Sequence, residues 1–270
     1  MSWFLLPLRL AETTPIPLPR LSVCWIYSVY DRGTMIKAIF LDAGGVILDE
    51  TQFEIIKSEI ITGIIKKHRN YSTEEYWCDT GEAVLGFVSS TYEYVLFKNI
   101  PDLFECKNAL KQFKEAWKAS SWEYKEMVGI EELLKVLSSK YKIGILGQYD
   151  SSLVDYLDEK KLLKYFSFTE TQEKYKTTKP DPRYFLDVIS NAKLQPNECI
   201  MIGDRIDKDI YPANIVGMRN IRVKTGLHLK QEPRIFIEVP DYTVNSLSEI
   251  SLELIESIET RSSFDNPHFW

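Results

Sequence analysis

The sequence predicts an α/β protein in which a parallel sheet lies between two layers of helices, with a helical insertion after the first strand. Short apolar runs rich in isoleucine alternate with segments of helical periodicity from residue 35 onward. Each run is followed by a polar or glycine-containing turn, whereas residues 51–127 contain several helical patterns and no convincing strand. Such alternation is typical of βαβ units, whose parallel strands are covered on both faces.

The predicted strands are near-continuous apolar runs, as expected for strands that are buried on both faces. They are IKAIFL (36–41), YKIGILG (141–147), ECIMIG (198–203) and RNIRVK (219–224). Helices are predicted between them, beginning at Glu131, Pro182 and Asp209. Asp181 is a suitable N-cap for the second of these helices, and proline is favoured at the first helical position. The core of the protein is therefore expected to comprise residues 35–50 and 128–260.

Residues 51–127 are predicted to form a separate helical domain inserted into this core. Thr51 with Glu54, and Ser72 with Glu75, have the spacing of a capping box, in which a hydroxyl and a carboxylate satisfy free backbone N–H groups at a helix start. The segment is also rich in aromatic residues. This density is more typical of a packed helical bundle than of a ligand cage.

The composition of the chain is that of an ordinary globular protein. It has 270 residues, of which 44% are hydrophobic and 27% are charged. The net charge of −6 argues against a nucleic-acid partner, because nucleic-acid-binding modules are usually basic on one face. No run of about 18 apolar residues is present, so we expect no transmembrane helix and no membrane partner.

The cysteines and the terminal segments bear on the location of the protein and on the limits of its folded part. The four cysteines are scattered without metal-binding spacing, which favours reduced thiols and a cytoplasmic protein. Residues 1–34 are rich in proline and lack the basic start and the long apolar run of a secretory signal. We interpret them as an N-terminal extension that is poorly ordered or that precedes the true start at Met35, and a transit peptide is the alternative. Residues 261–270 are expected to form a tail.

Polar groups and glycines follow the predicted strands where each strand ends. Asp42 follows the first strand, Gly147 and Gln148 end the second, and Asp204 follows ECIMIG. Lys179 lies in a turn just before a predicted helix. Ligands of open parallel sheets bind outside the carboxyl ends of the strands. We therefore expect these side chains to converge on one edge of the sheet.

The order of these residues along the chain resembles that of a known family. Asp42, the segment TTKPDPRYF (177–185) and the segment IMIGDRIDKDIYPANIVGM (200–218) are similar to the haloacid-dehalogenase-like (HAD) superfamily of hydrolases. The type that it resembles carries a helical cap after the first motif. The resemblance extends from Met35 to about residue 257, and it implies a three-layer Rossmann-like core with residues 51–127 as the cap domain.

The resemblance implies a role for each of five positions. Asp42 would be the nucleophile that forms a covalent aspartyl intermediate, and Lys179 would neutralise charge on the nucleophile and on the phosphoryl group. Asp204 and Asp209 would hold Mg²⁺ together with Asp42 and the backbone carbonyl of Gly44. Physical chemistry agrees with these roles, because converging carboxylates repel one another without a cation and Mg²⁺ prefers oxygen ligands. The implied partner is a small phosphorylated substrate.

Two positions depart from the pattern of the family's phosphatases. These enzymes carry a second aspartate two residues after the nucleophile, which protonates the leaving oxygen and then activates water, and this chain has Gly44 there. Their second motif ends in serine or threonine, and this chain has Gly147. The backbone N–H of Gly147, together with Gln148 and Lys179, remains a candidate for binding the phosphoryl group.

Three functions are compatible with these residues. The leading hypothesis is a Mg²⁺-dependent phosphomonoesterase that obtains its proton from the cap, from water or from the substrate. A dehalogenase-like hydrolase of carbon–halogen bonds would need no second aspartate, but it would also not need the acidic segment IGDRIDKD. The third is a catalytically weak relative that serves as a binding or regulatory module. His68, His228 and His268 form no cluster that would supply the missing acid.

Overall fold

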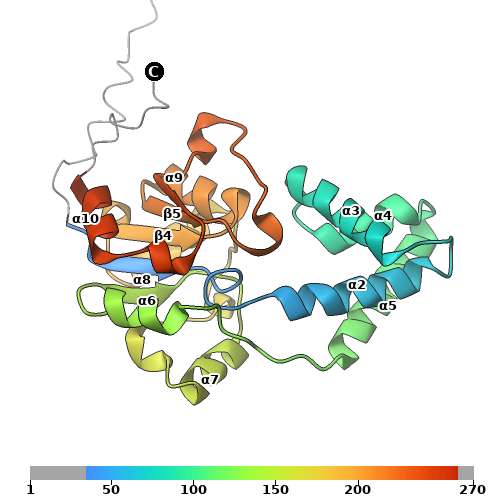
Figure 1. The fold of residues 1–270 in the computed structure, drawn as a ribbon, viewed down its shortest axis with the longest axis horizontal. Helices are drawn as coiled ribbons and strands as arrows, with labels where there is room; N and C mark the ends of the chain where they lie inside the picture. The colour runs from blue at the N-terminus through green and yellow to red at the C-terminus, as the bar shows by residue number, and fades with distance from the viewer. Residues whose placement is uncertain (1–34, 261–270) are drawn as a thin grey trace, which may run out of the picture. The chain divides into compact units, whose positions relative to one another are not determined.

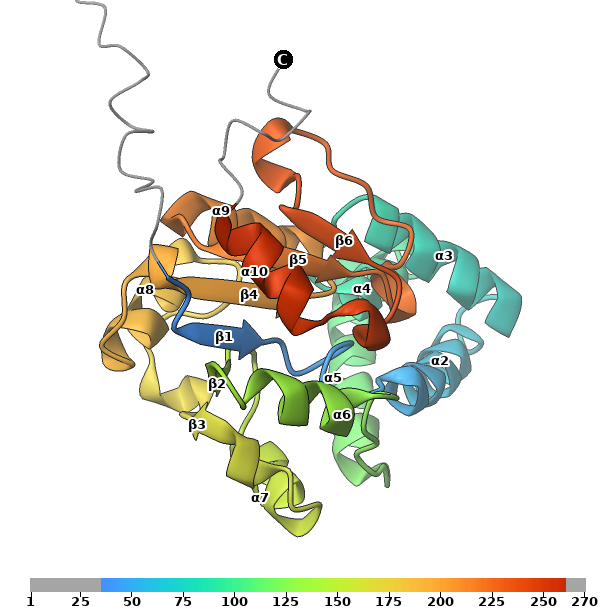
Figure 2. The same ribbon diagram turned by 60° about the vertical axis from the view of Figure 1, so that its left-hand side comes forward.

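The computed structural model describes residues 35–260, so the predicted extension (1–34) and tail (261–270) lie outside the described residues. Within this part the strands form one parallel sheet in the order β3-β2-β1-β4-β5-β6 (Figures 1 and 2). The strands are β1 (Ala38–Leu41), β2 (Lys142–Ile145), β3 (Phe166–Phe168), β4 (Cys199–Gly203), β5 (Arg219–Val223) and β6 (Tyr242–Val244). The predicted α/β class is therefore confirmed. The two edge strands, β3 and β6, were not predicted.

Strand β1 lies in the middle of the sheet and is completely buried. Its first residue, Ala38, is aligned with Lys142 of β2 and with Cys199 of β4. Successive side chains of a strand point to opposite faces. Ile39 therefore packs in the hydrophobic cluster on one face and Phe40 in the cluster on the other. This two-sided burial explains why the strand is a continuous apolar run rather than an alternating pattern.

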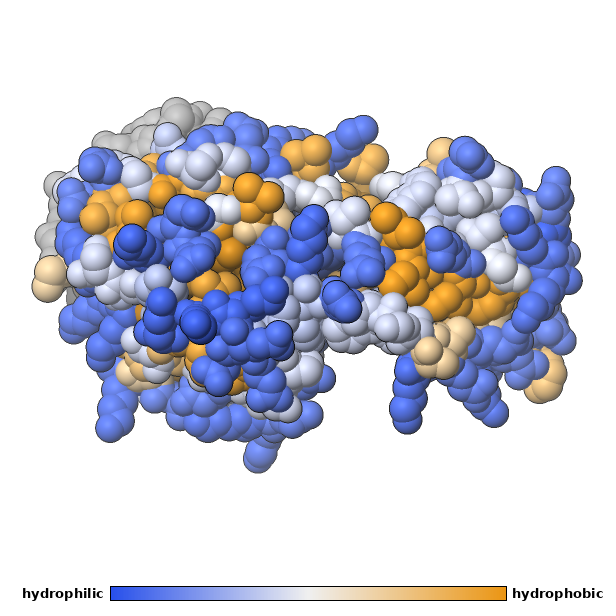
Figure 3. Space-filling model, turned by 60° about the horizontal axis from the view of Figure 1, so that its bottom comes forward, coloured by the Kyte–Doolittle hydropathy of each residue, from blue (hydrophilic) through white to orange (hydrophobic). Residues whose placement is uncertain are grey.

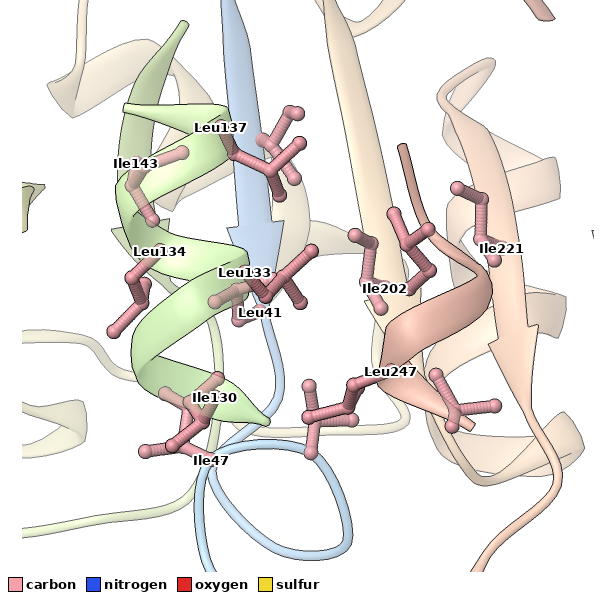
Figure 4. Close-up of a cluster of buried hydrophobic side chains, with 14 of the residues drawn as sticks. Leu41, Ile47, Ile130, Leu133, Leu134, Leu137, Ile143, Ile202, Ile221 and Leu247 are labelled. Carbon is pink, nitrogen blue, oxygen red and sulfur yellow. The ribbon is translucent and has the colours of Figure 1, made fainter. Parts of the chain in front are cut away.

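Helices cover both faces of the sheet. One face carries α6 (Ile130–Leu137), α7 (Ser151–Glu159) and α10 (Leu252–Thr260), and the other carries α8 (Pro182–Asn191) and α9 (Tyr211–Val216). Figure 2 shows α6 and α10 in front of the strands. Leu133 and Leu137 of α6 lie against β1 near Leu41 (Figure 4). Burying such side chains contributes about 1.5–3 kcal/mol each, so these two layers hold the strand ends in place.

The starts of helices α8 and α9 can be compared with the predicted starts at Pro182 and Asp209. Helix α8 begins at Pro182 as predicted, and the carboxylate of Asp181 accepts a hydrogen bond from the backbone N–H of Arg183. The helix predicted from Asp209 begins later, because the chain first makes a π-helical turn over Ile206–Ile210. π-Helical turns often occur at functional sites, and this one places Asp209 against the end of β4.

Between β1 and α6 the chain forms a helical insertion. Its helices are α2 (Thr51–Ile65), α3 (Thr73–Leu85), α4 (Thr91–Asn99) and α5 (Leu103–Ala119). They enclose a hydrophobic cluster of their own, which includes Ile61, Tyr76 and Phe113. The chain returns to the sheet where the backbone N–H of Met127 donates to the carbonyl of Ile47. The division of the chain into a core and a cap domain at residues 51 and 127 stays a prediction.

The two predicted capping boxes have different outcomes. Ser72 and Glu75 form a complete capping box at the start of α3, as predicted. The predicted box of Thr51 and Glu54 is wrong, because α2 already begins at Thr51 and the Glu54 carboxylate instead pairs with Lys57 at 2.5 Å. The residue in the N-cap position of α2 is Glu50, and its side chain makes no capping hydrogen bond.

The capping box of α3 should have a measurable effect on stability. We expect Ser72→Ala to lower the free energy of unfolding by about 1 kcal/mol, because the backbone N–H of Glu75 loses its acceptor. Urea denaturation of both proteins measures the difference. Thr73→Ala, which removes the neighbouring exposed hydroxyl, is the matched control. Equal losses in the two variants would contradict the capping role.

The described surface carries both hydrophilic and exposed apolar residues. Figure 3 shows a face on which hydrophilic residues predominate, with separate apolar patches between them. Isolated apolar residues are common on protein surfaces. Among residues 35–260, no helix combines the length and the apolar character that spanning a membrane requires.

Candidate active site

A polar cleft of about 380 Å³ lies at the carboxyl ends of the central strands. The sheet core contributes the side chains that follow β1 and β4, and the insertion contributes residues of α2 and of the start of α4. Its lining includes Asp42, Gly44, Glu50, Glu54, Lys57, Ser90, Gln148, Lys179, Asp204, Arg205, Lys208 and His228. Clefts of this size accommodate small ligands.

A buried lysine joins two of the predicted site residues. The ammonium group of Lys179 lies 2.9 Å from Oδ1 of Asp42 and 2.5 Å from Oδ1 of Asp209. Burial by itself would lower the pKa of Lys179, but the attraction of Asp209 and Asp42 holds that pKa above its usual value. Lys179 is therefore a permanent positive charge in direct contact with Asp42. The backbone N–H of Ala43 also donates to Oδ1 of Asp42, so the carboxylate is held in one orientation.

Three predicted acids converge beside this lysine. Asp42, Asp204 and Asp209 each place a carboxylate oxygen within 4.8 Å of the others. Asp204 and Asp209 are almost completely buried. Burial and the charges of neighbouring acids raise the pKa values of both carboxyl groups. The hydrogen bonds of the described residues include none to the carboxylate of Asp204. A buried cluster with this excess of negative charge fits a divalent cation that prefers oxygen ligands.

Glycines allow these acids to approach the backbone closely. A Cβ atom added at Gly203 would lie 2.4 Å from Cγ of Asp209, and one added at Gly45 would lie 2.8 Å from Cγ of Asp204. Gly45 also has a φ of +70°, in the region that favours glycine. The turn after β1 and the end of β4 therefore require glycine at these two positions.

The space beside Gly44 is filled by an acid, Glu50, that was not among the predicted site residues. A Cβ atom added at Gly44 would lie 2.5 Å from Oε1 and 2.6 Å from Cδ of Glu50. Glu50 is an exposed residue that lines the open cleft, and its carboxyl group lies against the backbone at Gly44. Desolvation at this position, together with the charge of Asp42, raises the pKa of Glu50 to about 7.

The second departure from the family pattern, Gly147, has a steric explanation. A Cβ atom at Gly147 would lie 2.8 Å from Oδ1 of Asp42 and 3.0 Å from the backbone N of Ala43. The carbonyl of Gly147 accepts a hydrogen bond from the hydroxyl of Tyr184 at 2.8 Å. Glycine thus allows β2 to approach Asp42 directly. Gln148 lines the cleft, and its amide donates to the hydroxyl of Thr178. The phosphate-binding role of Gly147 and Gln148 stays a prediction.

The two histidines among residues 35–260, His68 and His228, are not placed as proton donors of the cleft at neutral pH. His228 lines the cleft, but burial and the neighbouring Arg205 and Lys208 lower its pKa to about 3. His68 is exposed and does not line the cleft. His268 lies outside the described residues. The expectation that no histidine cluster exists therefore agrees with the described part of the chain.

Solved structures with the same fold share little sequence with this chain. The HAD hydrolase YfnB from Bacillus subtilis, bound to magnesium, superposes with a TM-score of 0.56 at 15% identity, over 83% of this chain and 99% of YfnB. The haloacid dehalogenase-like family protein SP0104 from Streptococcus pneumoniae gives a TM-score of 0.59 at 20% identity, over 79% and 96% of the two chains. These similarities show the fold alone.

Sequence relatives of known name match over shorter stretches. Glyceraldehyde 3-phosphate phosphatase from Methanopyrus kandleri is 33% identical over 86 residues, which are 32% of this chain and 37% of the relative. Haloacid dehalogenase-like hydrolase domain-containing protein 3 from Bos taurus is 29% identical over 153 residues, which are 55% of this chain and 59% of the relative. The chain therefore covers less than two thirds of the length of either relative.

The decisive comparison is with the family as a whole. The profile of the haloacid dehalogenase-like hydrolases matches residues 48–223, more than half of the chain. The matched range begins after Asp42 and includes Glu50, Lys179, Asp204 and Asp209. With the parallel sheet and the converging acids, this match confirms the resemblance that the motifs indicated. The chain belongs to the haloacid dehalogenase-like hydrolases.

Proposed function

We propose that this protein is a Mg²⁺-dependent phosphomonoesterase that acts on a small phosphorylated metabolite through a covalent intermediate on Asp42. The observation that carries the proposal is the contact of Asp42 with the buried Lys179, beside two further buried acids in a polar cleft. An anionic phosphoryl group can approach a carboxylate nucleophile only where positive charge offsets their repulsion. Lys179 supplies one such charge.

The comparisons support a phosphatase more than a dehalogenase. Relatives include glyceraldehyde 3-phosphate phosphatases, and a structural neighbour from Haemophilus somnus is a predicted phosphoglycolate phosphatase. The volume of about 380 Å³ also suits a small substrate. Hydrolysis of a carbon–halogen bond needs no acidic cation site, whereas three carboxylates converge here. The cytoplasmic location expected from the scattered cysteines remains part of this proposal.

The proposed reaction proceeds in two displacements. A carboxylate oxygen of Asp42 attacks the phosphorus atom, an acyl-phosphate (mixed anhydride) bond forms between Asp42 and phosphorus, and the bond from phosphorus to the leaving oxygen breaks. Lys179 offsets negative charge on Asp42 and on the phosphoryl oxygens throughout. Water then attacks the phosphorus of the aspartyl phosphate, which releases inorganic phosphate and restores the Asp42 carboxylate.

Residues of the same cleft would hold the metal ion. Asp42, Asp204 and Asp209 provide three carboxylates. The backbone carbonyl of Gly44, a residue that also lines the cleft, would be a further ligand. Mg²⁺ bound there would supply further positive charge to the phosphoryl group. The magnesium reported for YfnB supports this assignment.

The metal proposal predicts the effect of removing one ligand. We expect Asp204→Asn to weaken Mg²⁺ binding at least about tenfold, since changes even to groups outside the ligand shell cost 10- to 100-fold. Isothermal titration calorimetry measures the dissociation constants directly. Asp187→Asn removes an exposed acid of α8 and is the matched control. Equal Mg²⁺ affinity in the wild type and in Asp204→Asn would contradict the proposed site.

A substrate panel distinguishes the three candidate functions. Phosphate release from small phosphate esters only in the presence of Mg²⁺ is the expected result. Halide release from 2-haloacids without Mg²⁺ would instead indicate a dehalogenase. Absence of turnover in both sets, together with retained Mg²⁺ binding, would indicate a binding or regulatory protein.

A further inference from the structure

We propose that the carboxyl group of Glu50 occupies the place of the side chain missing at Gly44 and transfers the proton in the hydrolysis of phosphate esters. The inference rests on the proposed phosphatase function and adds a catalytic residue to it. The family's phosphatases have their acid two residues after the nucleophile. In this chain the acid would come from eight residues after the nucleophile, Asp42, through the turn that precedes α2.

The geometry around Gly44 supports this replacement. A Cβ atom at Gly44 would lie 2.5 Å from Oε1, 2.6 Å from Cδ and 2.8 Å from Oε2 of Glu50. All three atoms of the carboxyl group therefore surround the point where a longer side chain at position 44 would begin. An aspartate at position 44 and the present position of Glu50 exclude each other. Glycine at 44 is thus what admits the Glu50 carboxyl group to this part of the cleft.

The backbone of Gly44 does not itself require glycine. Gly45, the next residue, has a φ of +70°, but Gly44 is not among the described residues with positive φ. The nearest obstacles to a Cβ at Gly44 are all atoms of the Glu50 side chain. The absence of a side chain at 44 is therefore coupled to the presence of Glu50, rather than to the shape of the turn.

Glu50 is also not engaged by another structural role. It holds the N-cap position of α2, yet its side chain makes no capping hydrogen bond, and Asp49 accepts the hydrogen bond from the backbone N–H of Thr51 instead. No ion pair within 4.0 Å involves Glu50 among residues 35–260. The other glutamate in the cleft lining, Glu54, is paired with Lys57 at 2.5 Å. Of the two glutamates that line the cleft, Glu50 is therefore the one that is free to meet a substrate, whereas the buried Asp204 belongs to the candidate metal site.

The proton balance of the reaction assigns two steps to Glu50. As Asp42 attacks phosphorus and the phosphorus–oxygen bond of the ester breaks, the protonated Glu50 carboxyl group gives its proton to the leaving oxygen, which departs as an alcohol. The Glu50 carboxylate then takes a proton from the water that attacks the aspartyl phosphate. The products are one alcohol and one inorganic phosphate, and both Asp42 and Glu50 return to their starting states.

The first test separates leaving groups that need a proton from those that do not. Glu50→Gln should slow single-turnover release of the alcohol from an alkyl phosphate such as glycerol phosphate by about 10²- to 10⁴-fold. Release of nitrophenolate from nitrophenyl phosphate in the same Mg²⁺-containing assay should change less than about tenfold, because nitrophenolate departs without a proton. Asp49→Asn is the matched control, since Asp49 is the adjacent acid and does not line the cleft; it should leave both rates unchanged.

The second test moves the acid back to position 44. Glu50→Ala should lose alkyl phosphate hydrolysis. The double variant Gly44→Asp, Glu50→Ala should hydrolyse alkyl phosphates at least about tenfold faster than Glu50→Ala, because removal of the Glu50 carboxyl group leaves room for the new side chain.

Equal losses on alkyl and nitrophenyl phosphates in Glu50→Gln would overturn the proposal and indicate a structural role. If the wild type hydrolysed neither the alkyl phosphate nor nitrophenyl phosphate, the phosphatase function itself would be contradicted. Wild-type turnover with an unaffected Glu50→Gln variant would contradict only the role of Glu50.

Discussion

Replacement of Asp42 by asparagine should abolish Mg²⁺-dependent release of phosphate from small phosphate esters. We expect a loss on the order of 10⁴-fold or more, the size of effect that follows removal of the nucleophile from a covalent mechanism. The amide has nearly the shape of the carboxylate, but it cannot form an aspartyl phosphate. It also removes one of the two negative partners of Lys179, whose ammonium nitrogen lies 2.9 Å from Oδ1 of Asp42.

Three measurements distinguish loss of the nucleophile from loss of the folded structure. Steady-state phosphate release gives the turnover, and intact-mass analysis after acid quenching should detect the phosphorylated enzyme in the wild type but not in Asp42→Asn. Asp187→Asn, an equivalent change on the exposed side of α8, should retain both signals. Turnover by Asp42→Asn at the wild-type rate would exclude Asp42 as the nucleophile. Urea denaturation should confirm that the variant is folded.

Much of the architecture could be predicted from the sequence because the central strands have an unambiguous pattern. Strands β1, β2 and β4 are buried on both faces, and each is largely an apolar run. Strand β5 is also largely buried, but it contains the buried polar residues Asn220 and Arg222. In a parallel sheet their carboxyl ends meet at one edge, which is why Asp42 and Asp204 were expected to converge. The structure places their carboxylates within 4.8 Å of each other. Their roles in metal binding stay predictions.

The edge strands and one helix start were missed for reasons of local structure. Strands β3 and β6 have three residues each and are only partly buried, so they lack a distinctive apolar run. The segment at Asp209 has helical composition, but a π-helical turn over Ile206–Ile210 precedes α9. At this turn the Asp209 carboxylate accepts a local hydrogen bond from the backbone N–H of Arg205, and it also makes a tertiary contact with Lys179, which is distant in the sequence.

Glu50 could not be identified from its position in the sequence. It precedes the start of α2, where an acid is ordinarily explained as a cap or as a favourable charge near the helix N-terminus. Its contact with Gly44 depends on how the chain turns after β1, including the left-handed Gly45 and the hydrogen bond from the backbone N–H of Gly45 to the carbonyl of Leu48. The one available signal was Gly44 itself, since a missing side chain leaves space that another residue can fill.

Replacement of Lys179 by methionine should cause a large loss of stability as well as of activity. The ammonium group is almost completely buried between Asp42 and Asp209, and its removal would leave their charges uncompensated. Breaking a buried ion pair by removing one partner costs about 3–5 kcal/mol. We expect a decrease of that size in the free energy of unfolding, measured by urea denaturation at neutral pH in the presence of a chelator.

The dependence of this loss on Mg²⁺ tests the electrostatic explanation. A cation bound by Asp42, Asp204 and Asp209 would replace part of the missing positive charge, so saturating Mg²⁺ should restore more stability to Lys179→Met than it adds to the wild type. Lys224→Met removes a lysine whose partner, Glu232, is exposed, and it should change stability far less because exposed ion pairs contribute little. If Lys179→Met and Lys224→Met had equal free energies of unfolding in the chelator, the repulsion among the three acids would not destabilise the folded state. An equal response of Lys179→Met and the wild type to Mg²⁺ would show that the lysine and the metal site are electrostatically independent.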